Sequence, residues 1–257
     1  MIGKRRLILG RKNGQGVGMK SSPPLMPSQI ETWVFDLDNT LYPAAHSLFP
    51  QIDTRIRAYI ANHLSLDLDE AYRLQKHYYR EYGTTLRGLM SLHDVNPHEF
   101  LLYVHDIDHS VLDPSPRLGA ALMALPGRKL VFTNGSTAHA EQVLKRLDIS
   151  EHFEGIFDIV DADFIPKPDM RPYQMLGQRF DVRFNHAAMI EDLERNLVPA
   201  ASLGMATVWI KQDEHPDRKF LDTPSQNPSH VHHITGDLIL WLEQMVDSDP
   251  RLKPSCA

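Results

Sequence analysis

Trp33-Val34-Phe35-Asp36-Leu37-Asp38-Asn39-Thr40 is the stretch around which the chain is organised, because an apolar run ends there in two carboxylates and a hydroxyl. The pattern predicts a buried strand that delivers Asp36 and Asp38 to its carboxyl end, where open α/β sheets bind their ligands. Neighbouring carboxylates repel each other and persist in an apolar fold only when a cation or a proton neutralises them. Mg²⁺ prefers oxygen ligands and often shares them with a substrate phosphate. The stretch therefore predicts a magnesium site that serves phosphoryl chemistry.

Two other structures contain Asp-x-Asp pairs. A solvated turn is the commoner one, so Asp36 and Asp38 need partners elsewhere in the chain before they indicate a catalytic site. A calcium-binding loop requires Gly at its sixth position and Glu at its twelfth. Leu41 and Ser47 occupy those positions here, which excludes the calcium loop.

The composition is that of a soluble globular protein with a substantial core. The chain has 257 residues, of which 42% are hydrophobic, enough for one large domain or for a core with a smaller insertion. A net charge of −6 argues against general affinity for nucleic acid or for anionic membranes, and no apolar run approaches the roughly 18 residues that span a bilayer. The single cysteine, Cys256, excludes an internal disulfide and fits a reducing compartment, so we expect a cytoplasmic protein.

Residues 1–29 are predicted to form a disordered leader. They are rich in basic residues, glycine and proline, and they lack the roughly 7–15-residue apolar core of a signal peptide. A basic arm that binds nucleic acid is one alternative. A start codon assigned too far upstream is another, with Met19 or Met26 as the true first residue, and mass spectrometry of the native protein tests it.

Residues 44–115 are predicted to form a separate helical cap, inserted after the first strand. Apolar residues recur there at three- and four-residue spacing, as in Leu48, Ile52 and Ile56, which is typical of amphipathic helices. We expect helices over residues 47–63, 69–83, 85–93 and 99–107.

Residues 30–43 and 116–257 are predicted to form a Rossmann-like parallel sheet core. Strands and helices alternate along this part, and such alternation indicates parallel strands joined by right-handed crossovers. The fold class is therefore α/β with an inserted α-helical cap. We expect strands over residues 129–133, 156–160, 187–190 and 206–210, helices over 117–125, 136–147, 172–180, 196–203 and 236–246, and a polar surface loop over 212–230.

Three further polar signals fall at or near the ends of predicted strands. Thr133-Asn134-Gly135-Ser136 combines a hydroxyl, an amide and the N–H groups that open a helix, which together can hold an anion. Lys167 lies between two prolines, which fix the backbone on both sides and thereby orient a single cation. Glu191-Asp192 repeats the pattern of an apolar strand that ends in acids. Each signal alone also fits an ordinary turn or a solvated surface. Adjacent strands of one sheet would bring them together beside Asp36.

In this order and spacing, the signals resemble the motifs of the haloacid dehalogenase superfamily of phosphotransferases: Asp-x-Asp-x-Thr, a strand-terminal Ser or Thr, a Lys and an acidic pair. The match extends from about Thr32 to Ile210. The resemblance implies that Asp36 is the nucleophile that forms an aspartyl phosphate. It also implies that Asp38 is the general acid to the leaving oxygen and then the general base to the hydrolytic water.

The same resemblance assigns the groups that hold phosphate and metal. It implies that Thr133 and Lys167 contact the transferring phosphoryl oxygens, and Asn134 is a further candidate for substrate binding. Glu191 stands where the family more often has Asp or Gly, so its contact with Mg²⁺ is expected through a water. The other implied Mg²⁺ ligands are the carboxylates of Asp36 and Asp192 and the backbone carbonyl of Asp38.

The acid at position 38 distinguishes among reaction types. Dehalogenases of the superfamily typically lack it and its transporting ATPases carry Lys there, so Asp38 indicates a phosphatase or a phosphomutase. A helical cap closes over small soluble substrates, so a small-molecule phosphomonoester is the expected partner. A catalytically silent binding or regulatory module is the rival from another class. It would be expected to have lost one of four residues that are all present: Asp36, Asp38, Lys167 and Asp192.

Residues 35–43, 82–89, 104–108 and 125–135 look like the pyrimidine 5′-nucleotidase branch of the superfamily. The resemblance implies hydrolysis of UMP and CMP to nucleoside and phosphate, with another small phosphometabolite such as a sugar phosphate as the alternative substrate. Four polar or aromatic cap residues are candidates for reading the base and ribose, and ordinary packing between helices is an equal alternative for each. They are Tyr82, Arg87, His93 and His105.

Overall fold

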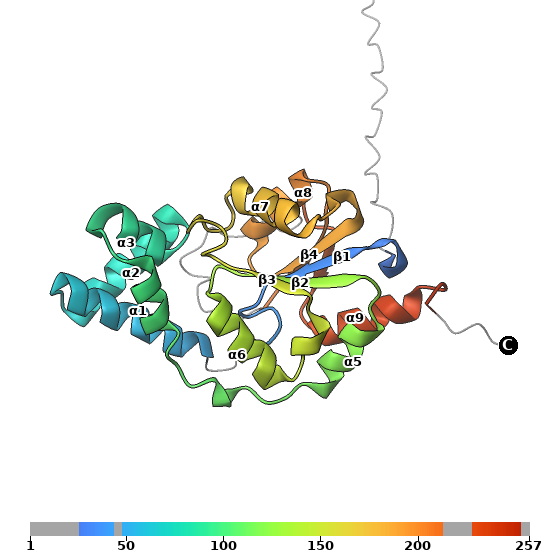
Figure 1. Cartoon of the computed structure of the whole chain (residues 1–257), viewed down its shortest axis with the longest axis horizontal. Coiled ribbons are helices and arrows are strands. Elements are labelled where there is room, and N and C mark those ends of the chain that lie inside the picture. The colour runs from blue at the N-terminus through green and yellow to red at the C-terminus, as the bar shows by residue number, and fades with distance from the viewer. Residues whose placement is uncertain (1–25, 44–47, 213–227, 253–257) are drawn as a thin grey trace, which may run out of the picture.

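A parallel sheet lies at the centre of the molecule (Figure 1). It has six strands in the order β3-β2-β1-β4-β5-β6. The structure is a computed structural model and describes residues 26–43, 48–212 and 228–252. Within these residues no helix combines the length and the apolarity needed to cross a bilayer. The predicted α/β fold class is confirmed. The strands are β1 (Thr32–Phe35), β2 (Arg128–Phe132), β3 (Gly155–Phe157), β4 (Ala187–Glu191), β5 (Ala206–Ile210) and β6 (His233–Thr235).

Strand β1 is buried on both faces because helices cover each side of the sheet. Trp33 and Phe35 pack on one face with the apolar sides of α5, α6 and α9, whereas Val34 packs on the other with those of α7 and α8. Alternate side chains of a strand point to opposite faces, so a strand covered twice is apolar throughout. The core helices are α5 (Pro116–Ala124), α6 (Thr137–Leu147), α7 (Met170–Phe180), α8 (Leu197–Ser202) and α9 (Leu238–Ser248).

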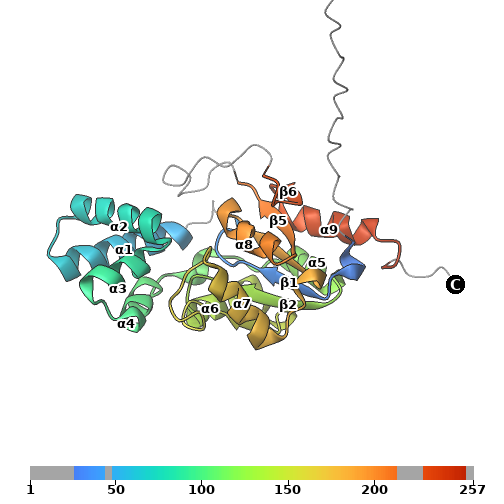
Figure 2. The same ribbon diagram turned by 90° about the horizontal axis from the view of Figure 1, so that it is seen from above.

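The helices inserted after β1 form a cap beside the sheet (Figure 2). Polar side chains begin three of them: Asp67, Thr84 and Asn96 each accept a main-chain N–H of the first turn, as N-cap residues do. The apolar side chains of the cap form a cluster that includes fully buried Ile60 and Leu89 and extends to Ile159, which follows β3. Its helices are α1 (Leu48–Leu64), α2 (Leu68–Tyr82), α3 (Thr85–His93) and α4 (Pro97–Val104).

The order of the strands places the carboxyl ends of β1 and β4 side by side. The chain runs from β1 outward to β2 and β3 and then returns to the other side of β1 as β4. Phe35 pairs in register with Val131 of β2 and with Ile190 of β4, so the residues that follow these positions emerge at one edge of the sheet. Such a switch point is where open α/β sheets bind ligands. It brings Asp36 next to Glu191.

The strand predicted over residues 156–160 is shorter in the structure and ends at Phe157. The carboxylate of Asp158 is the cause. Its Oδ1 accepts the N–H groups of Val160 and Asp161 at 2.9 and 2.8 Å, and this local bonding turns the chain out of the sheet. Short 3₁₀ helices complete the described elements: Pro27–Gln29, His109–Val111, Ser150–His152, Phe184–His186 and Glu194–Asn196.

Two segments outside the predicted core elements also differ from expectation. Residues 27–29, assigned to a disordered leader, form a 3₁₀ helix, because the N–H of Ser28 donates to Oδ2 of buried Asp249 at 2.9 Å. Strand β6 was not predicted, because it is short and its apolar residue, Ile234, is exposed. The remaining expectations for the leader, the start of the cap and the polar loop fall on residues 1–25, 44–47 and 213–227, which lie outside the described residues.

Candidate active site

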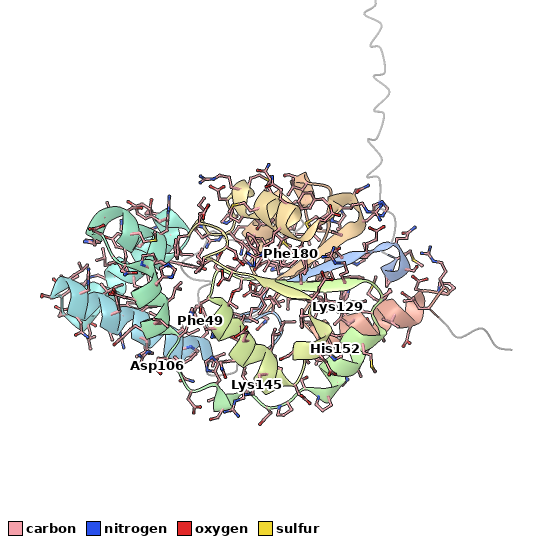
Figure 3. The ribbon with its side chains drawn as sticks, viewed as in Figure 1. Phe49, Asp106, Lys129, Lys145, His152 and Phe180 are labelled. Atoms are coloured by element: carbon pink, nitrogen blue, oxygen red, sulfur yellow. The ribbon has the colours of Figure 1, made fainter. Side chains whose placement is uncertain are left out.

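A cleft lies between the cap and the carboxyl edge of the sheet. It is lined from the core by residues at or after the ends of β1, β2, β3 and β4, and from the cap by residues of α1, α2, α3 and α4. Figure 3 shows Phe49, one of the lining residues, at the start of α1 where the cap meets the core. Arg195 of the core links the two sides. Its guanidinium carbon lies 5.1 Å from the ring centre of Tyr79 on α2, and it donates to the carbonyl of Gly83 at 3.4 Å.

The ammonium group of Lys167 joins the acids at the ends of β1 and β4. Nζ donates to Asp36 Oδ1 at 2.7 Å, to Glu191 Oε2 at 2.8 Å and to the main-chain oxygen of Phe132 at 2.9 Å, so its three N–H groups all have acceptors. Asn134 holds the loop that carries the lysine. Its Oδ1 accepts the Lys167 N–H at 2.9 Å and its Nδ2 donates to the Lys167 carbonyl at 3.4 Å. Asn134, nominated for substrate binding, therefore uses both ends of its amide to position Lys167.

Burial changes the pKa values of the charged groups in this cluster. It raises the pKa of Asp36 to about 7, with the negative charge of Glu191 adding to the effect and Lys167 opposing it. It also raises the pKa of Glu191 to about 7, with Lys167 opposing and Asp192 adding to the effect. Burial alone would lower the pKa of Lys167, but Asp36 and Glu191 hold it above its ordinary value. A cation added beside these acids would favour their ionised forms.

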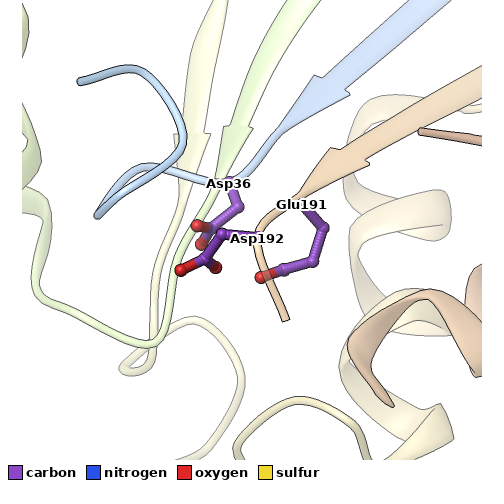
Figure 4. A group of neighbouring side chains, drawn as sticks. All are labelled: Asp36, Glu191 and Asp192. Atoms are coloured by element: carbon purple, nitrogen blue, oxygen red, sulfur yellow. The ribbon is translucent and has the colours of Figure 1, made fainter. Parts of the chain in front are cut away.

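Asp36, Glu191 and Asp192 form a group of oxygens that could hold a metal ion (Figure 4). One carboxylate oxygen from each lies within 4.8 Å of the others. Both oxygens of Glu191 already accept hydrogen bonds, Oε2 from Lys167 and Oε1 from a main-chain N–H at 3.2 Å. Buried Asn196 also lines the cleft, and its Oδ1 has no hydrogen-bond partner among the described residues. Hard oxygen ligands that share a cleft with such an acceptor fit a hydrated divalent cation such as Mg²⁺.

Two donors converge on one oxygen of Asp38. The Tyr42 hydroxyl donates to Oδ1 at 2.5 Å, and His139 Nε2 lies 2.8 Å from the same atom. Burial would raise the pKa of this carboxyl, but His139 and the Tyr42 hydroxyl outweigh it and lower the pKa to about 2. His139 is itself buried, with His109 Nε2 3.1 Å from its Nδ1 and the His105 ring stacked on it at 4.6 Å. Asp38 is therefore ionised at neutral pH and held in one orientation.

Residues 30–204 of the chain match a family model described as haloacid dehalogenase-like hydrolase. The matched part contains the whole cluster, from Asp36 to Asn196. The chain belongs to the haloacid dehalogenase-like hydrolase family. This confirms the superfamily that the sequence motifs predicted.

Two named relatives are similar to this haloacid dehalogenase-like hydrolase over most of its length. Phosphate metabolism protein 8 of Saccharomyces cerevisiae is 30% identical over 248 residues, which cover 88% of this chain and 77% of that protein. A glyceraldehyde 3-phosphate phosphatase of Methanopyrus kandleri is 28% identical over 203 residues, which cover 73% of this chain and 87% of that protein. These names do not single out the predicted pyrimidine 5′-nucleotidase branch.

Solved structures share the hydrolase fold at low sequence identity. The HAD-hydrolase YfnB of Bacillus subtilis, in a structure bound to magnesium, has a TM-score of 0.52 at 13% identity, with 85% of this chain and 99% of that chain covered. The L-2-haloacid dehalogenase of Xanthobacter autotrophicus has a TM-score of 0.52 at 15% identity, with 85% and 99% covered. Similarity at this level of identity shows the fold alone, and the reaction of this hydrolase depends on the residues of its site.

Of the four nominated cap residues, His105 lines the cleft of the hydrolase. Tyr82 packs edge-on against Tyr78 with ring centres 5.7 Å apart, and His93 Nε2 lies 2.6 Å from the Tyr78 hydroxyl. Both side chains are thus engaged inside the cap. Arg87 is likewise absent from the described residues that line the cleft. The structure therefore does not bring Tyr82, His93 or Arg87 to the site.

Several residues of the hydrolase site were not predicted, among them Tyr42, Gln75, Asn196 and His139. Gln75 is a polar residue on the buried face of α2, and this placement on an apolar stripe was a usable signal. Asn196 follows Asp192 by about one helical turn, which was a second signal. His139 offered none, since it is 101 positions from Asp38 and only the packing of α6 against the loop after β1 brings the two together.

Proposed function

We propose that the protein is a magnesium-dependent phosphomonoesterase that forms an aspartyl phosphate on Asp36. The observation that carries the proposal is the contact of Lys167 with both Asp36 and Glu191 at the switch point of the sheet. A cation held beside a nucleophile stabilises the negative charge of a phosphoryl group during transfer. Asp38 supplies a second acid that protonates a leaving oxygen. Dehalogenation does not require such an acid.

Thr133 is suited to hold a phosphoryl oxygen next to Lys167. Its Oγ1 accepts the N–H of Gly135 at 2.9 Å, and this leaves the hydroxyl proton to be donated elsewhere. The side chain is buried and lines the same cleft as Asp36. Thr133 would thus donate to a phosphoryl oxygen, and the positive charge of Lys167 would stabilise the phosphoryl group that Asp36 attacks.

Mg²⁺ is the metal that we propose for the site. The carboxylates of Asp36 and Asp192 and the backbone carbonyl of Asp38 would hold it, and Glu191, whose oxygens already accept hydrogen bonds, would reach it through a water. When bound, the ion neutralises phosphoryl oxygens and orients them. The magnesium in the related Bacillus subtilis structure supports this choice.

The proposed substrate is a small phosphorylated metabolite that fits beneath the cap. The name of the Methanopyrus kandleri relative, a glyceraldehyde 3-phosphate phosphatase, favours a sugar phosphate. The cap side of the cleft favours a second candidate, UMP or CMP, because a largely apolar wall can pack against a ring. The apolar residues of that wall are Phe49, Ile52, Ile56, Leu86, Phe100, Leu101 and Val104.

Phosphate release from a panel of substrates tests the proposal. The panel contains glyceraldehyde 3-phosphate, ribose 5-phosphate, UMP, CMP and AMP, each with Mg²⁺ and with EDTA. We expect release with Mg²⁺ and none with EDTA. Preference for the sugar phosphates would remove the pyrimidine assignment, and preference for UMP and CMP over AMP and the sugars would establish it. Halide release from 2-chloropropionate, with no phosphate from any substrate, would overturn the phosphatase.

Mg²⁺ binding is expected to weaken as the pH falls below about 7. In the metal-free protein the pKa values of Asp36 and Glu191 are both raised to about 7, and the cation binds the ionised forms. Protons therefore compete with the metal below that pH, by up to about tenfold in affinity per pH unit for each proton displaced. Calorimetric titration about one unit below and one unit above this pH measures the effect. Glu191→Gln removes one titrating group and should give a shallower slope, whereas a pH-independent affinity would contradict the prediction.

A further inference from the structure

Gln75 lies in the middle of α2 with its side chain buried, and it lines the cleft. Its Nε2 donates to the carboxylate Oδ1 of Asp53 at 2.8 Å and to the main-chain oxygen of Asp53 at 3.3 Å. Lys76 forms an ion pair with the same carboxylate. Both partners of the amide are acceptors only, so its nitrogen must face them and its oxygen must face away. The surroundings therefore fix the orientation of the Gln75 amide.

The oxygen of this amide is a buried acceptor. Gln75 Oε1 is buried and accepts no hydrogen bond from the described residues. Native structures rarely leave a buried acceptor without a donor from protein, water or ligand. The backbone is anchored at the same point, because Thr85 Oγ1 donates to the Gln75 carbonyl at 3.1 Å. Oε1 is therefore a preorganised acceptor on a residue that lines the cap side of the cleft.

The surroundings of Gln75 favour an uncharged donor as the group that meets Oε1. The cap side of the cleft is largely apolar, with Phe49, Ile52 and Phe100 among its lining residues. The charged groups next to the amide, Asp53 and Lys76, are paired with each other. A charged end of a ligand would lose its hydration there without gaining a counter-ion of its own, whereas an N–H or O–H group needs only the acceptor that Gln75 offers.

We propose that Gln75 Oε1 accepts a hydrogen bond from an uncharged N–H or O–H group at the end of the substrate remote from its phosphate. The inference rests on the proposed phosphomonoesterase activity, because a phosphate placed at Asp36 leaves the other end of the ligand to reach the cap through the same cleft. Gln75 thereby determines specificity, since a ligand without the donor leaves Oε1 unsatisfied. The imide N–H of a nucleobase and the hydroxyl of a sugar are two sources of this donor.

Gln75→Met tests the proposal, since Met has a similar length and lacks the amide oxygen. kcat/KM is measured with Mg²⁺ on UMP, 3-methyluridine 5′-monophosphate, ribose 5-phosphate and p-nitrophenyl phosphate. We expect a loss of about tenfold or more on the substrate whose donor meets Oε1, and a value within about twofold of wild type on p-nitrophenyl phosphate, which has no such donor. Gln174→Met, at an exposed position of α7 outside the cleft, is the matched control and should change none of the four.

The substrates separate the outcomes. The donor belongs to the base if two results agree: wild type prefers UMP to 3-methyluridine 5′-monophosphate, and Gln75→Met lowers kcat/KM on UMP. Loss on ribose 5-phosphate and on both nucleotides assigns it to a hydroxyl. Equal loss on all four, including p-nitrophenyl phosphate, or loss on none would overturn the proposal. A wrong assignment of the phosphatase activity can be told apart from a wrong role for Gln75. In that case the wild-type protein would release no phosphate even from p-nitrophenyl phosphate.

Discussion

Asp36→Asn is expected to abolish phosphate release, with kcat lowered by about 10⁴-fold or more. An amide does not attack phosphorus as a carboxylate does, so no phosphoenzyme forms. The substitution keeps the size of the side chain and one of its two acceptor oxygens. In the wild type, Lys167 Nζ donates to Asp36 Oδ1 at 2.7 Å and Thr40 Oγ1 donates to Asp36 Oδ2 at 2.9 Å. The measurement is steady-state phosphate release at saturating Mg²⁺, together with hydroxylamine-sensitive labelling of the protein by a radiolabelled phosphate ester. Wild type should be labelled and the variant should not.

The loss must be separated from a failure to fold. Because burial and Glu191 raise the pKa of Asp36 to about 7, its contribution to stability is present at low pH and is lost as the pH rises through that value. Asn does not ionise, so above about pH 7 the metal-free variant should melt at or above the wild-type temperature. Asp163→Asn, at an exposed position, is the matched control and should keep full activity. Activity retained in Asp36→Asn would remove Asp36 as nucleophile.

The core side of the site could be predicted because its residues sit at the ends of buried strands. Asp36 follows β1, Thr133 follows β2 and Glu191 ends β4, and an apolar run that stops at a polar residue is visible in a sequence. The strand order is not visible in this way. That β4 returns to pair with β1 depends on packing across the whole sheet, and only this pairing puts Glu191 beside Asp36.

The cap side could not be predicted by the same reasoning. Helical periodicity shows which face of a helix is apolar, but a cap helix meets both the cap's apolar cluster and the cleft. Tyr82 and Gln75 both lie on α2, yet Tyr82 packs on Tyr78 inside the cap while Gln75 lines the cleft. How the cap docks on the core decides between these environments. The same docking brings His105, from the end of α4, onto the His139 ring.

Asp38→Asn is expected to slow turnover by about 10²–10⁴-fold and to leave the first chemical step on an activated ester largely intact. His139 and Tyr42 lower the pKa of Asp38 to about 2 against the effect of burial, so the carboxylate is ionised at neutral pH and can act as base toward the hydrolytic water. p-Nitrophenolate leaves without a proton, so the variant should still transfer the phosphoryl group to Asp36. It should then stall as the phosphoenzyme. Stopped-flow absorbance should therefore show a burst of p-nitrophenol stoichiometric with active sites, followed by a slow steady rate.

An alkyl phosphate separates the acid role of Asp38 from its base role. An alkoxide leaving group needs a proton, so the variant should show no burst of uridine from UMP in rapid-quench experiments. A carboxyl with a pKa of about 2 is a poor acid, but a bound phosphate dianion adds negative charge beside it and raises that pKa. The same group can then donate a proton in the first half-reaction and accept one in the second. Asn keeps an oxygen that can accept from Tyr42 and His139. The difference between wild type and variant therefore reports the proton transfer alone. Equal loss on both esters, without a burst on either, would contradict both roles.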